Sequence, residues 1–304
     1  MQKRHKSLSN DLLKSPNLFC LGAPKCGTTS LYQMLSQHEM ICVPIPKEPH
    51  FFCSDVNYSR GLDYYKRAYF SNFAGEEFVC DFTPSYLASP AAPKRIYDAV
   101  GENAKFIIIA RNPVDRLYSH YLHNVRDALE FRPFEVAIAE DAMEFSQGIT
   151  GDYVSPSSYG FHLQRYLEFF PRSNLLFLIF EEDLAKHPQI CFDAVCGFLG
   201  IQKKQLSLPL KRAPSPEAKK SMLWLKYLIN TRWPWREKIK GFVSPRLRQN
   251  IRQTVNYIGN RPSSESKRLD VDVRMKLLSK YFDSDIINQA NKHLLHPLSL
   301  LGTC

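Results

Sequence analysis

The sequence predicts an α/β fold in which a central parallel sheet is flanked by helices. Two observations support this prediction: short apolar runs rich in β-branched and aromatic residues recur along the chain, and segments with helical spacing separate them. Strands that alternate with helices form βαβ units, whose strands come together in one parallel sheet. A chain of 304 residues, of which 44% are hydrophobic, is long enough to bury both faces of such a sheet.

The elements follow one another along the first two thirds of the chain. The expected strands are the apolar runs Leu18–Leu21, Phe78–Cys80, Phe106–Ile109 and Leu175–Phe180. The expected helices are the segments with helical spacing, Thr28–Gln37, Gly61–Phe70, Pro90–Val100, Pro113–Leu129 and Tyr159–Phe169. Proline suits the first turn of a helix, which supports the start at Pro113.

Beyond about Leu206 the strand patterns stop, and the sequence becomes helical, basic and punctuated by proline. We therefore expect one domain over residues 1–304, with an α/β core at 15–200 and a helical, basic C-terminal part at 201–304. Within that part, residues 202–268 hold 17 Lys/Arg and three Glu, a net charge of +14. Because the whole chain has a net charge of +10, the remaining residues sum to −4. Such a local excess excludes an evenly basic nucleic-acid-binding domain.

The basic segment 219–252 also contains all three tryptophans, Trp224, Trp233 and Trp235. Three interpretations stay open for it. It steers an anionic substrate toward the protein, it contacts an anionic membrane surface, or it is a solvated basic face over buried tryptophans. No nucleic-acid-binding module accompanies the charge, so nucleic acid is not expected as a partner.

Targeting signals are also missing from the sequence. No window approaches the roughly 18 apolar residues of a membrane span, and Met1–Ser15 is basic and polar, unlike a secretory signal. The eight cysteines include no CxxC pair and no metal-like spacing, and several fall in predicted buried strands. We therefore expect a cytoplasmic protein without a bound metal, associated with a membrane if segment 219–252 contacts lipid. A location in the Golgi lumen would require that an N-terminal anchor had been removed.

The first predicted strand leads into a loop with the composition of an anion-binding site. Residues 24–31, PKCGTTSL, open a helix, whose first amides and dipole attract an anion. Gly22 and Gly27 let the backbone curl around phosphate oxygens, and Lys25 adds a positive charge. In the ATP-binding P-loop the lysine directly follows the second glycine, but here Thr28 takes that position, which argues against an ordinary ATP or GTP site. If only the two glycines are considered, the alternative is an ordinary turn between a strand and a helix that binds no ligand.

A second anion-binding pattern, IIIARNPVDRLYSHY, covers residues 107–121. Arg111 ends a predicted strand and Ser119 lies on the helix that follows, and the planar fork of an arginine suits a phosphate group. Taken alone, Arg111 could instead pair with Asp115. Together and in this order, the two patterns resemble those of the sulfotransferases that use 3′-phosphoadenosine 5′-phosphosulfate (PAPS), and the resemblance covers about 17–200.

This resemblance implies a three-layer P-loop-like fold and a PAPS site that requires no metal. By residue match, the groups that hold the 5′-phosphosulfate and the 3′-phosphate are Lys25, Cys26, Gly27, Thr28, Thr29, Ser30, Arg111 and Ser119. Tyr159 stands at the start of a helix that lies near the cofactor in this family. Lys267 and Arg268 match a late basic loop that closes over the nucleotide.

Residues 46–52, PKEPHFF, resemble an element of the carbohydrate sulfotransferases, especially those that act on heparan chains. In those enzymes the glutamate is the general base, so the resemblance assigns this role to Glu48 and places His50 and Lys47 at the acceptor, with His50 also catalytic. The cation that offsets charge on the leaving phosphate would be Lys25. A solvated pair between Lys47 and Glu48 is the alternative.

Residues 81–90, DFTPSYLASP, resemble the loop after the second strand of the same enzymes. The match implies that Thr83 and Tyr86 contact the acceptor, with packing and capping of the loop as an equal alternative. Phe82 stands where the heparan enzymes often carry lysine, which argues against a highly anionic acceptor.

The sequence therefore predicts an enzyme that transfers a sulfuryl group in line from PAPS to a carbohydrate, glycolipid or polysaccharide acceptor, at a hydroxyl rather than an amine. One alternative is a P-loop kinase for a small metabolite, against which the displaced Lys25 counts. The other is a non-catalytic protein of the same fold that binds a membrane or a polyanion.

Overall fold

The computed structural model describes residues 13–127, 129–207 and 269–282, which divide into two compact units. The first unit is formed by 1–113, 156–211 and 282–304, and the second by 114–155 and 212–281. Segment 219–252, Lys267 and Arg268 lie outside the described residues.

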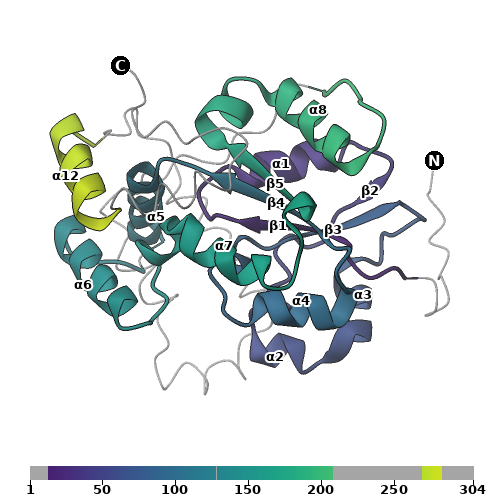
Figure 1. The fold of residues 1–304 in the computed structure, drawn as a ribbon, viewed down its shortest axis with the longest axis horizontal. Helices are drawn as coiled ribbons and strands as arrows, with labels where there is room; N and C mark the ends of the chain where they lie inside the picture. The colour runs from purple at the N-terminus through teal and green to yellow at the C-terminus, as the bar shows by residue number, and fades with distance from the viewer. Residues whose placement is uncertain (1–12, 128, 208–268, 283–304) are drawn as a thin grey trace, which may run out of the picture. The chain divides into compact units, whose positions relative to one another are not determined.

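The first unit contains a parallel five-stranded sheet with the strand order β2-β3-β1-β4-β5 (Figure 1). Its strands are β1 (Leu18–Gly22), β2 (Ile41–Cys42), β3 (Phe78–Phe82), β4 (Lys105–Ala110) and β5 (Leu175–Ile179). The four predicted strands are confirmed. The strand β2 was not predicted, because two residues are too few to show a periodic pattern.

Helices cover both faces of this sheet. The longer ones are α1 (Thr28–Leu35), α3 (Gly61–Tyr69), α4 (Ala92–Val100), α7 (Tyr159–Leu167) and α8 (Pro188–Leu199). The shorter turns are α2 (Asp55–Tyr58), η2 (Pro84–Tyr86), η4 (Arg172–Asn174) and η5 (Phe180–Ala185). Helices α1 and α8 lie on one side of the sheet and α4 on the other (Figure 1), which confirms the three-layer α/β prediction.

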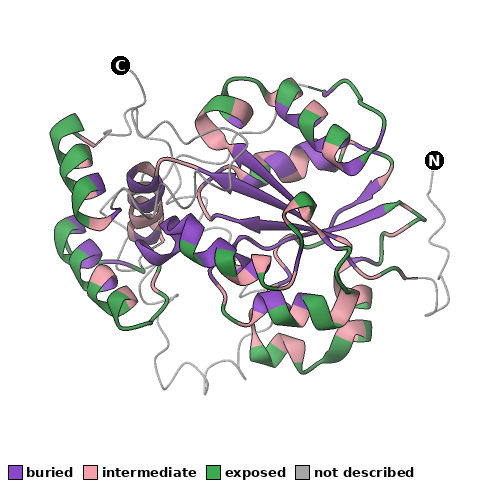
Figure 2. Cartoon of the chain, viewed as in Figure 1, coloured by how far each residue is buried: buried purple, intermediate pink, exposed green. Residues whose placement is uncertain are grey.

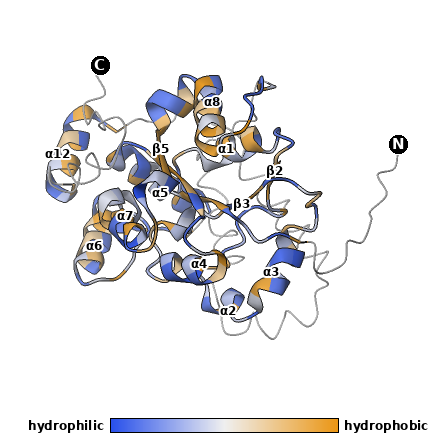
Figure 3. Ribbon diagram, turned by 45° about the vertical axis from the view of Figure 1, so that its right-hand side comes forward, coloured by the Kyte–Doolittle hydropathy of each residue, from blue (hydrophilic) through white to orange (hydrophobic). Residues whose placement is uncertain are grey.

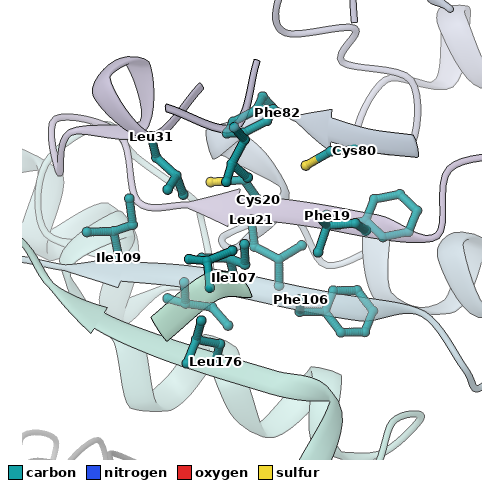
Figure 4. Packing of buried hydrophobic residues seen from close by; sticks show 14 of the residues in the cluster. Phe19, Cys20, Leu21, Leu31, Cys80, Phe82, Phe106, Ile107, Ile109 and Leu176 are labelled. Carbon is teal, nitrogen blue, oxygen red and sulfur yellow. The ribbon is translucent and has the colours of Figure 1, made fainter. Parts of the chain in front are cut away.

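The sheet forms the core of the first unit. All residues of β1 and β3 are buried (Figure 2), as expected for strands covered on both faces. Phe19 of β1 stacks on its register neighbour Phe106 of β4 with ring centroids 5.7 Å apart (Figure 4). Phe106 also packs against Tyr166 of α7 and against Phe170, which follows that helix. The helices α3 and α8 carry both hydrophobic and hydrophilic residues (Figure 3), so each can pack one face inward and leave another exposed.

The second unit contains helices. They are α5 (Pro113–Arg126, which begins one residue before the unit), α6 (Phe134–Ser146) and α12 (Val271–Tyr281), and η3 (Ser155–Ser157) lies at its border with the first unit. The buried carboxylate of Asp141 accepts hydrogen bonds from the backbone N–H groups of Asp152, Tyr153 and Val154, at 2.7 to 3.1 Å. This carboxylate holds the loop before η3 in place, because three backbone donors find their acceptor there.

Among the described residues, no helix is long and apolar enough to cross a membrane. The seven cysteines in these ranges are free thiols, and six of them are buried. The same part of the chain holds no group of three or more His, Cys, Asp or Glu side chains that could bind a metal ion.

Candidate active site

The predicted site residues of the first unit follow the carboxyl ends of neighbouring strands. Lys25 comes after β1, Glu48 and His50 come after β2, Thr83 directly follows β3, and Arg111 directly follows β4. The carboxyl ends of parallel strands meet at one edge of a sheet, and the crevice outside that edge is where ligands bind in open α/β folds. The fold therefore brings together residues that are far apart in the sequence.

The loop between β1 and α1 has the backbone geometry of an anion cradle. Gly27 takes a left-handed conformation (φ 87°) at the start of α1, where it accepts hydrogen bonds from the N–H groups of Ser30 and Leu31. Lys25 also has a positive φ of 68°, which an L-residue adopts at a cost. Ala23 donates a hydrogen bond from its N–H group to the carbonyl of Ile109 (3.0 Å), which ties the loop to β4. The first amides of α1 thus sit at the end of a curled loop, as anion binding requires.

Gly22 has no room for a side chain, and this predicts a large effect of substitution. Its φ is 128°, and a Cβ atom there would lie 2.4 Å from the carbonyl oxygen of Pro84. We expect Gly22→Ala to lower the free energy of unfolding by roughly 2–4 kcal/mol, through backbone strain and overpacking. Urea denaturation measures this change. The matched control is Gly197→Ala in α8, where a Cβ meets nothing within 4 Å; that variant should gain up to about 1 kcal/mol. Equal stability of the two variants would contradict the steric argument.

Arg111 connects the two anion-binding motifs. Its Nη1 donates a hydrogen bond to the carbonyl oxygen of Lys25 (3.1 Å), and its Nε lies 3.6 Å from Oε1 of Glu181. This Nε is buried and has no hydrogen-bond partner within the described ranges. A buried guanidinium donor that lacks an acceptor, beside a curled glycine loop, fits a phosphate group as ligand.

The hydroxyl of Tyr159 supports the same corner. It donates a hydrogen bond to the carbonyl of Arg111 (3.0 Å), accepts one from the N–H group of Arg111 (3.3 Å) and lies 3.7 Å from Sγ of Cys26. The structure therefore brings together four of the residues predicted to bind the cofactor, namely Lys25, Cys26, Arg111 and Tyr159. Ser119 lies on α5 in the second unit.

Glu181 is a site residue that the sequence did not reveal. Acidic residues directly after an apolar run are typical of an ordinary helix start, but here they form the π-helical turn η5. There Oε1 of Glu181 accepts a hydrogen bond from the N–H group of Asn112 (3.2 Å) next to the guanidinium of Arg111. The signal in the sequence was an acidic residue directly beyond a buried strand, at the same edge of the sheet as Arg111.

The loop after β2 places three predicted residues in contact. Nζ of Lys47 donates a hydrogen bond to Oε1 of Glu48, and Nε2 of His50 lies 3.7 Å from Oε2 of Glu48. On its other side, Nδ1 of His50 lies 3.0 Å from Oγ of Ser85 and 3.7 Å from Sγ of Cys53. The carboxylate of Glu48 therefore sits between two basic side chains.

These contacts set the charge of the loop. Partial burial raises the pKa of Glu48, but the nearby imidazole of His50 and the charge of Lys47 outweigh burial and lower the pKa to about 2. The contacts of His50 with Cys53 and with the carboxylate of Glu48 raise the pKa of His50 to about 9. At neutral pH, Glu48 is therefore ionised and His50 is protonated.

Thr83 and Tyr86, which the resemblance placed at the acceptor, are fully buried. Their hydroxyls donate hydrogen bonds to the carboxylate of Asp81, at 2.7 Å and 2.8 Å respectively, and accept hydrogen bonds from backbone N–H groups. These contacts match the packing alternative rather than direct contact with an acceptor. Phe82 is also fully buried and packs edge-on against Tyr32.

Comparisons with known proteins agree with this geometry. The family model described as "Sulfotransferase domain" matches residues 15–243. The human bifunctional heparan sulfate N-deacetylase/N-sulfotransferase 2 is 28% identical over 212 residues, which make up 66% of this chain and 24% of that protein. Human heparan sulfate glucosamine 3-O-sulfotransferase 6 is 31% identical over 193 residues, 62% of this chain and 53% of that protein. The chain thus spans about a quarter to a half of the length of these relatives.

A solved structure shows the same fold. The crystal structure of a sulfotransferase from Alicyclobacillus acidocaldarius superposes with a TM-score of 0.57 at 31% sequence identity, covering 79% of this chain and 96% of that one. A family model that matches most of the chain, together with this shared fold, shows that the chain belongs to the family of PAPS-dependent sulfotransferases.

Proposed function

We propose that this enzyme transfers a sulfuryl group from PAPS to a hydroxyl of a carbohydrate or glycoconjugate. The observation that carries the proposal is Arg111, whose guanidinium binds the carbonyl of Lys25 while its buried Nε lacks a hydrogen-bond partner among the described residues. One side chain thereby ties the loop that would hold the 5′-phosphosulfate to the strand end that would hold the 3′-phosphate. The relatives that act on heparan sulfate support a carbohydrate as acceptor.

We infer the roles of the residues from the resemblance of their motifs. The amides and hydroxyls of Gly27, Thr28, Thr29 and Ser30 would hold the 5′-phosphosulfate, and Arg111 and Ser119 the 3′-phosphate. When bound, PAPS supplies the sulfuryl group and leaves as 3′-phosphoadenosine 5′-phosphate (PAP). As the acceptor oxygen bonds to sulfur and the bond from sulfur to the phosphate oxygen breaks, the acceptor proton moves to Glu48. Lys25 offsets the negative charge that develops on the leaving phosphate.

A hydroxyl acceptor depends on Glu48 more than an amine does. A hydroxyl must lose its proton as it attacks, whereas a neutral amine attacks with a free lone pair and needs a base only afterwards. The carboxylate of Glu48 is ionised, so its proton-accepting form is present throughout the neutral range, and the two neighbouring cations that lower its pKa also weaken it as a base. The replacement of the heparan-type lysine by a buried Phe82 supports an acceptor less anionic than heparan sulfate.

A thermal-shift experiment tests the donor site. At a hundredfold excess over its dissociation constant, PAP is expected to raise the melting temperature by roughly 5 °C, while ATP with Mg²⁺ leaves it unchanged. Arg111→Ala should abolish the PAP shift, because it removes the guanidinium that faces both motifs. The matched control is Arg67→Ala, at an exposed position of α3, which should keep the full shift. Equal stabilisation by ATP would favour a kinase, and a PAP shift that survives in Arg111→Ala would contradict the assignment.

The pKa values predict an unusual pH dependence of turnover. The pKa of Glu48 is lowered to about 2, so its basic form is lost only in strong acid; the pKa of His50 is raised to about 9, so its proton is lost only in alkali. We expect kcat to stay level between about pH 5 and about pH 8 and to fall as His50 deprotonates. His50→Gln should remove that alkaline limb. A limb at the ordinary histidine pKa, about 6.5, would contradict the contacts described here.

A screen of glycans and glycolipids with ³⁵S-labelled PAPS tests the acceptor class. Incorporation into hydroxyl-bearing glycans without free amines is the expected result. Lipid-vesicle binding without transfer to any glycan would instead favour a non-catalytic protein that binds membranes.

A further inference from the structure

The loop that carries Glu48 and His50 has a strained backbone that needs support. Glu48 and His50 both take left-handed conformations, with φ of 65° and 49°. For residues other than glycine such conformations cost about 1–3 kcal/mol each and persist only where neighbouring groups hold them. The support must therefore come from contacts that the loop makes with the rest of the unit.

Hydroxyl groups supply that support from inside the core. The hydroxyl of Thr83 accepts a hydrogen bond from the N–H group of His50 (3.3 Å). The hydroxyl of Tyr86 accepts hydrogen bonds from the N–H groups of Phe51 (3.0 Å) and Phe52 (3.2 Å). Three consecutive backbone donors of the loop thus end on two buried hydroxyl oxygens.

A hydroxyl has a single hydrogen, so the group that takes it decides which way the oxygen lone pairs point. Here that group is Asp81, at the end of β3, which is fully buried. Its Oδ1 accepts the hydrogen of Thr83 (2.7 Å) and its Oδ2 accepts that of Tyr86 (2.8 Å). With both hydrogens directed at the carboxylate, the lone pairs of both oxygens are left to face the loop.

We propose that Asp81 is a positioning residue for the transfer reaction: its carboxylate orients two hydroxyls so that they hold the loop that carries the base. This positioning role rests on the proposed function, because it assumes that the loop takes part in sulfuryl transfer. The hydrogen bonds that hold the loop do not depend on that assumption. Asp81 itself is fully buried, so it acts through Thr83 and Tyr86. The carbonyls of Pro49 and His50 accept hydrogen bonds from Nδ2 of Asn57, which fixes the same stretch from its other side.

The chain offers a matched pair of variants. Tyr65 and Tyr86 are both fully buried and both donate to Oδ2 of Asp81, but in the described ranges only the hydroxyl of Tyr86 also contacts loop amides. The ring of Tyr65 stacks on Phe51 with centroids 4.3 Å apart, and a phenylalanine keeps this contact. Tyr65→Phe therefore removes a hydrogen bond to the carboxylate without removing a loop anchor.

Two measurements on the full chain test the proposal. Hydrogen–deuterium exchange of the peptide that spans residues 47–53 reports whether the loop is held, whether or not an acceptor is known. In Tyr86→Phe we expect this exchange to accelerate by roughly tenfold, since two amides lose their acceptor. Its kcat should fall by roughly a hundredfold, as for a misplaced catalytic group, with the PAP-induced thermal shift unchanged. Tyr65→Phe should keep both the exchange rate and, within about twofold, kcat.

The outcomes separate the two proposals. If Tyr86→Phe keeps wild-type exchange and kcat, or if Tyr65→Phe loses both equally, the positioning role of Asp81 is overturned. If the wild type transfers no sulfuryl group, the proposed function fails, while the exchange rates still decide whether the network holds the loop. Should Tyr86→Phe not fold, Thr83→Val and Thr83→Ser give a second pair: the valine removes the hydroxyl that binds His50, and the serine restores it. Rescue of kcat by serine supports the proposal, and equal loss in both variants overturns it.

Discussion

The Glu48→Gln variant is expected to turn over about a thousandfold more slowly than the wild type, within the range that removal of a general base costs. Glutamine keeps the length of the side chain and its position between Lys47 and His50, but it cannot accept the proton of the acceptor. The loss should fall on kcat, because the charge is needed when the acceptor attacks. Steady-state kinetics with labelled PAPS measures it.

The control for this variant is Glu39→Gln, which removes the carboxylate of an exposed ion pair with Lys204. Its kcat should match the wild type, because exposed ion pairs contribute little to the fold. The PAP-induced thermal shift should also persist in Glu48→Gln, which would show that the donor site is intact. Full turnover by Glu48→Gln would exclude Glu48 as the base.

The Lys25→Met variant should lose roughly a hundred- to a thousandfold in kcat. Lys25 follows β1 in the curled loop, and its carbonyl is held by Arg111, so the residue stays in place when its charge is removed. Methionine keeps most of the length of the side chain, and neither residue is glycine, so the backbone cost of φ 68° is the same in both. Without the ammonium group, negative charge on the leaving phosphate is no longer offset.

The matched control is Lys94→Met on α4, which removes a surface charge paired with Asp98. It should leave kcat unchanged, since both side chains of this ion pair are exposed and such pairs contribute little to the fold. If Lys25→Met weakens PAP binding but leaves kcat at the wild-type value, Lys25 holds the donor and does not act on the leaving group.

The four predicted strands and the five predicted helices are all present in the structure, with ends that differ by at most three residues. They could be predicted because each has a strong local pattern, continuous and apolar in the strands and amphipathic in the helices. The strand β2 and helices α2, α6 and α8 were not predicted. In β2 and α2 the elements are too short, at two and four residues, for a period to appear.

The candidate site likewise contains residues that the sequence could predict and residues that it could not. The residues of the curled loop and Arg111 could be predicted as candidates, because glycine, lysine and hydroxyl residues between a strand and a helix are typical of an anion-binding site. Glu181 could not, because an acidic residue after a strand is common, and only β5 lying beside β4 brings it to Arg111. The direction of the Thr83 and Tyr86 hydroxyls likewise depends on Asp81, which the sequence shows only as one acid in a loop motif.

The sequence by itself determined the fold class, the position of the loop between β1 and α1 and the residue types in it, because these follow from local pattern and residue type. Only the tertiary structure decided how the loop after β2 is held, since its anchors are Thr83, directly after β3, and Tyr86 of η2, more than thirty residues away. A hydrogen bond depends on the distance and direction between two groups, and the spacing of residues along the chain gives neither. That is the reason why the sequence left acceptor contact and packing as equal alternatives for Thr83 and Tyr86, which lie in the core and anchor the loop after β2.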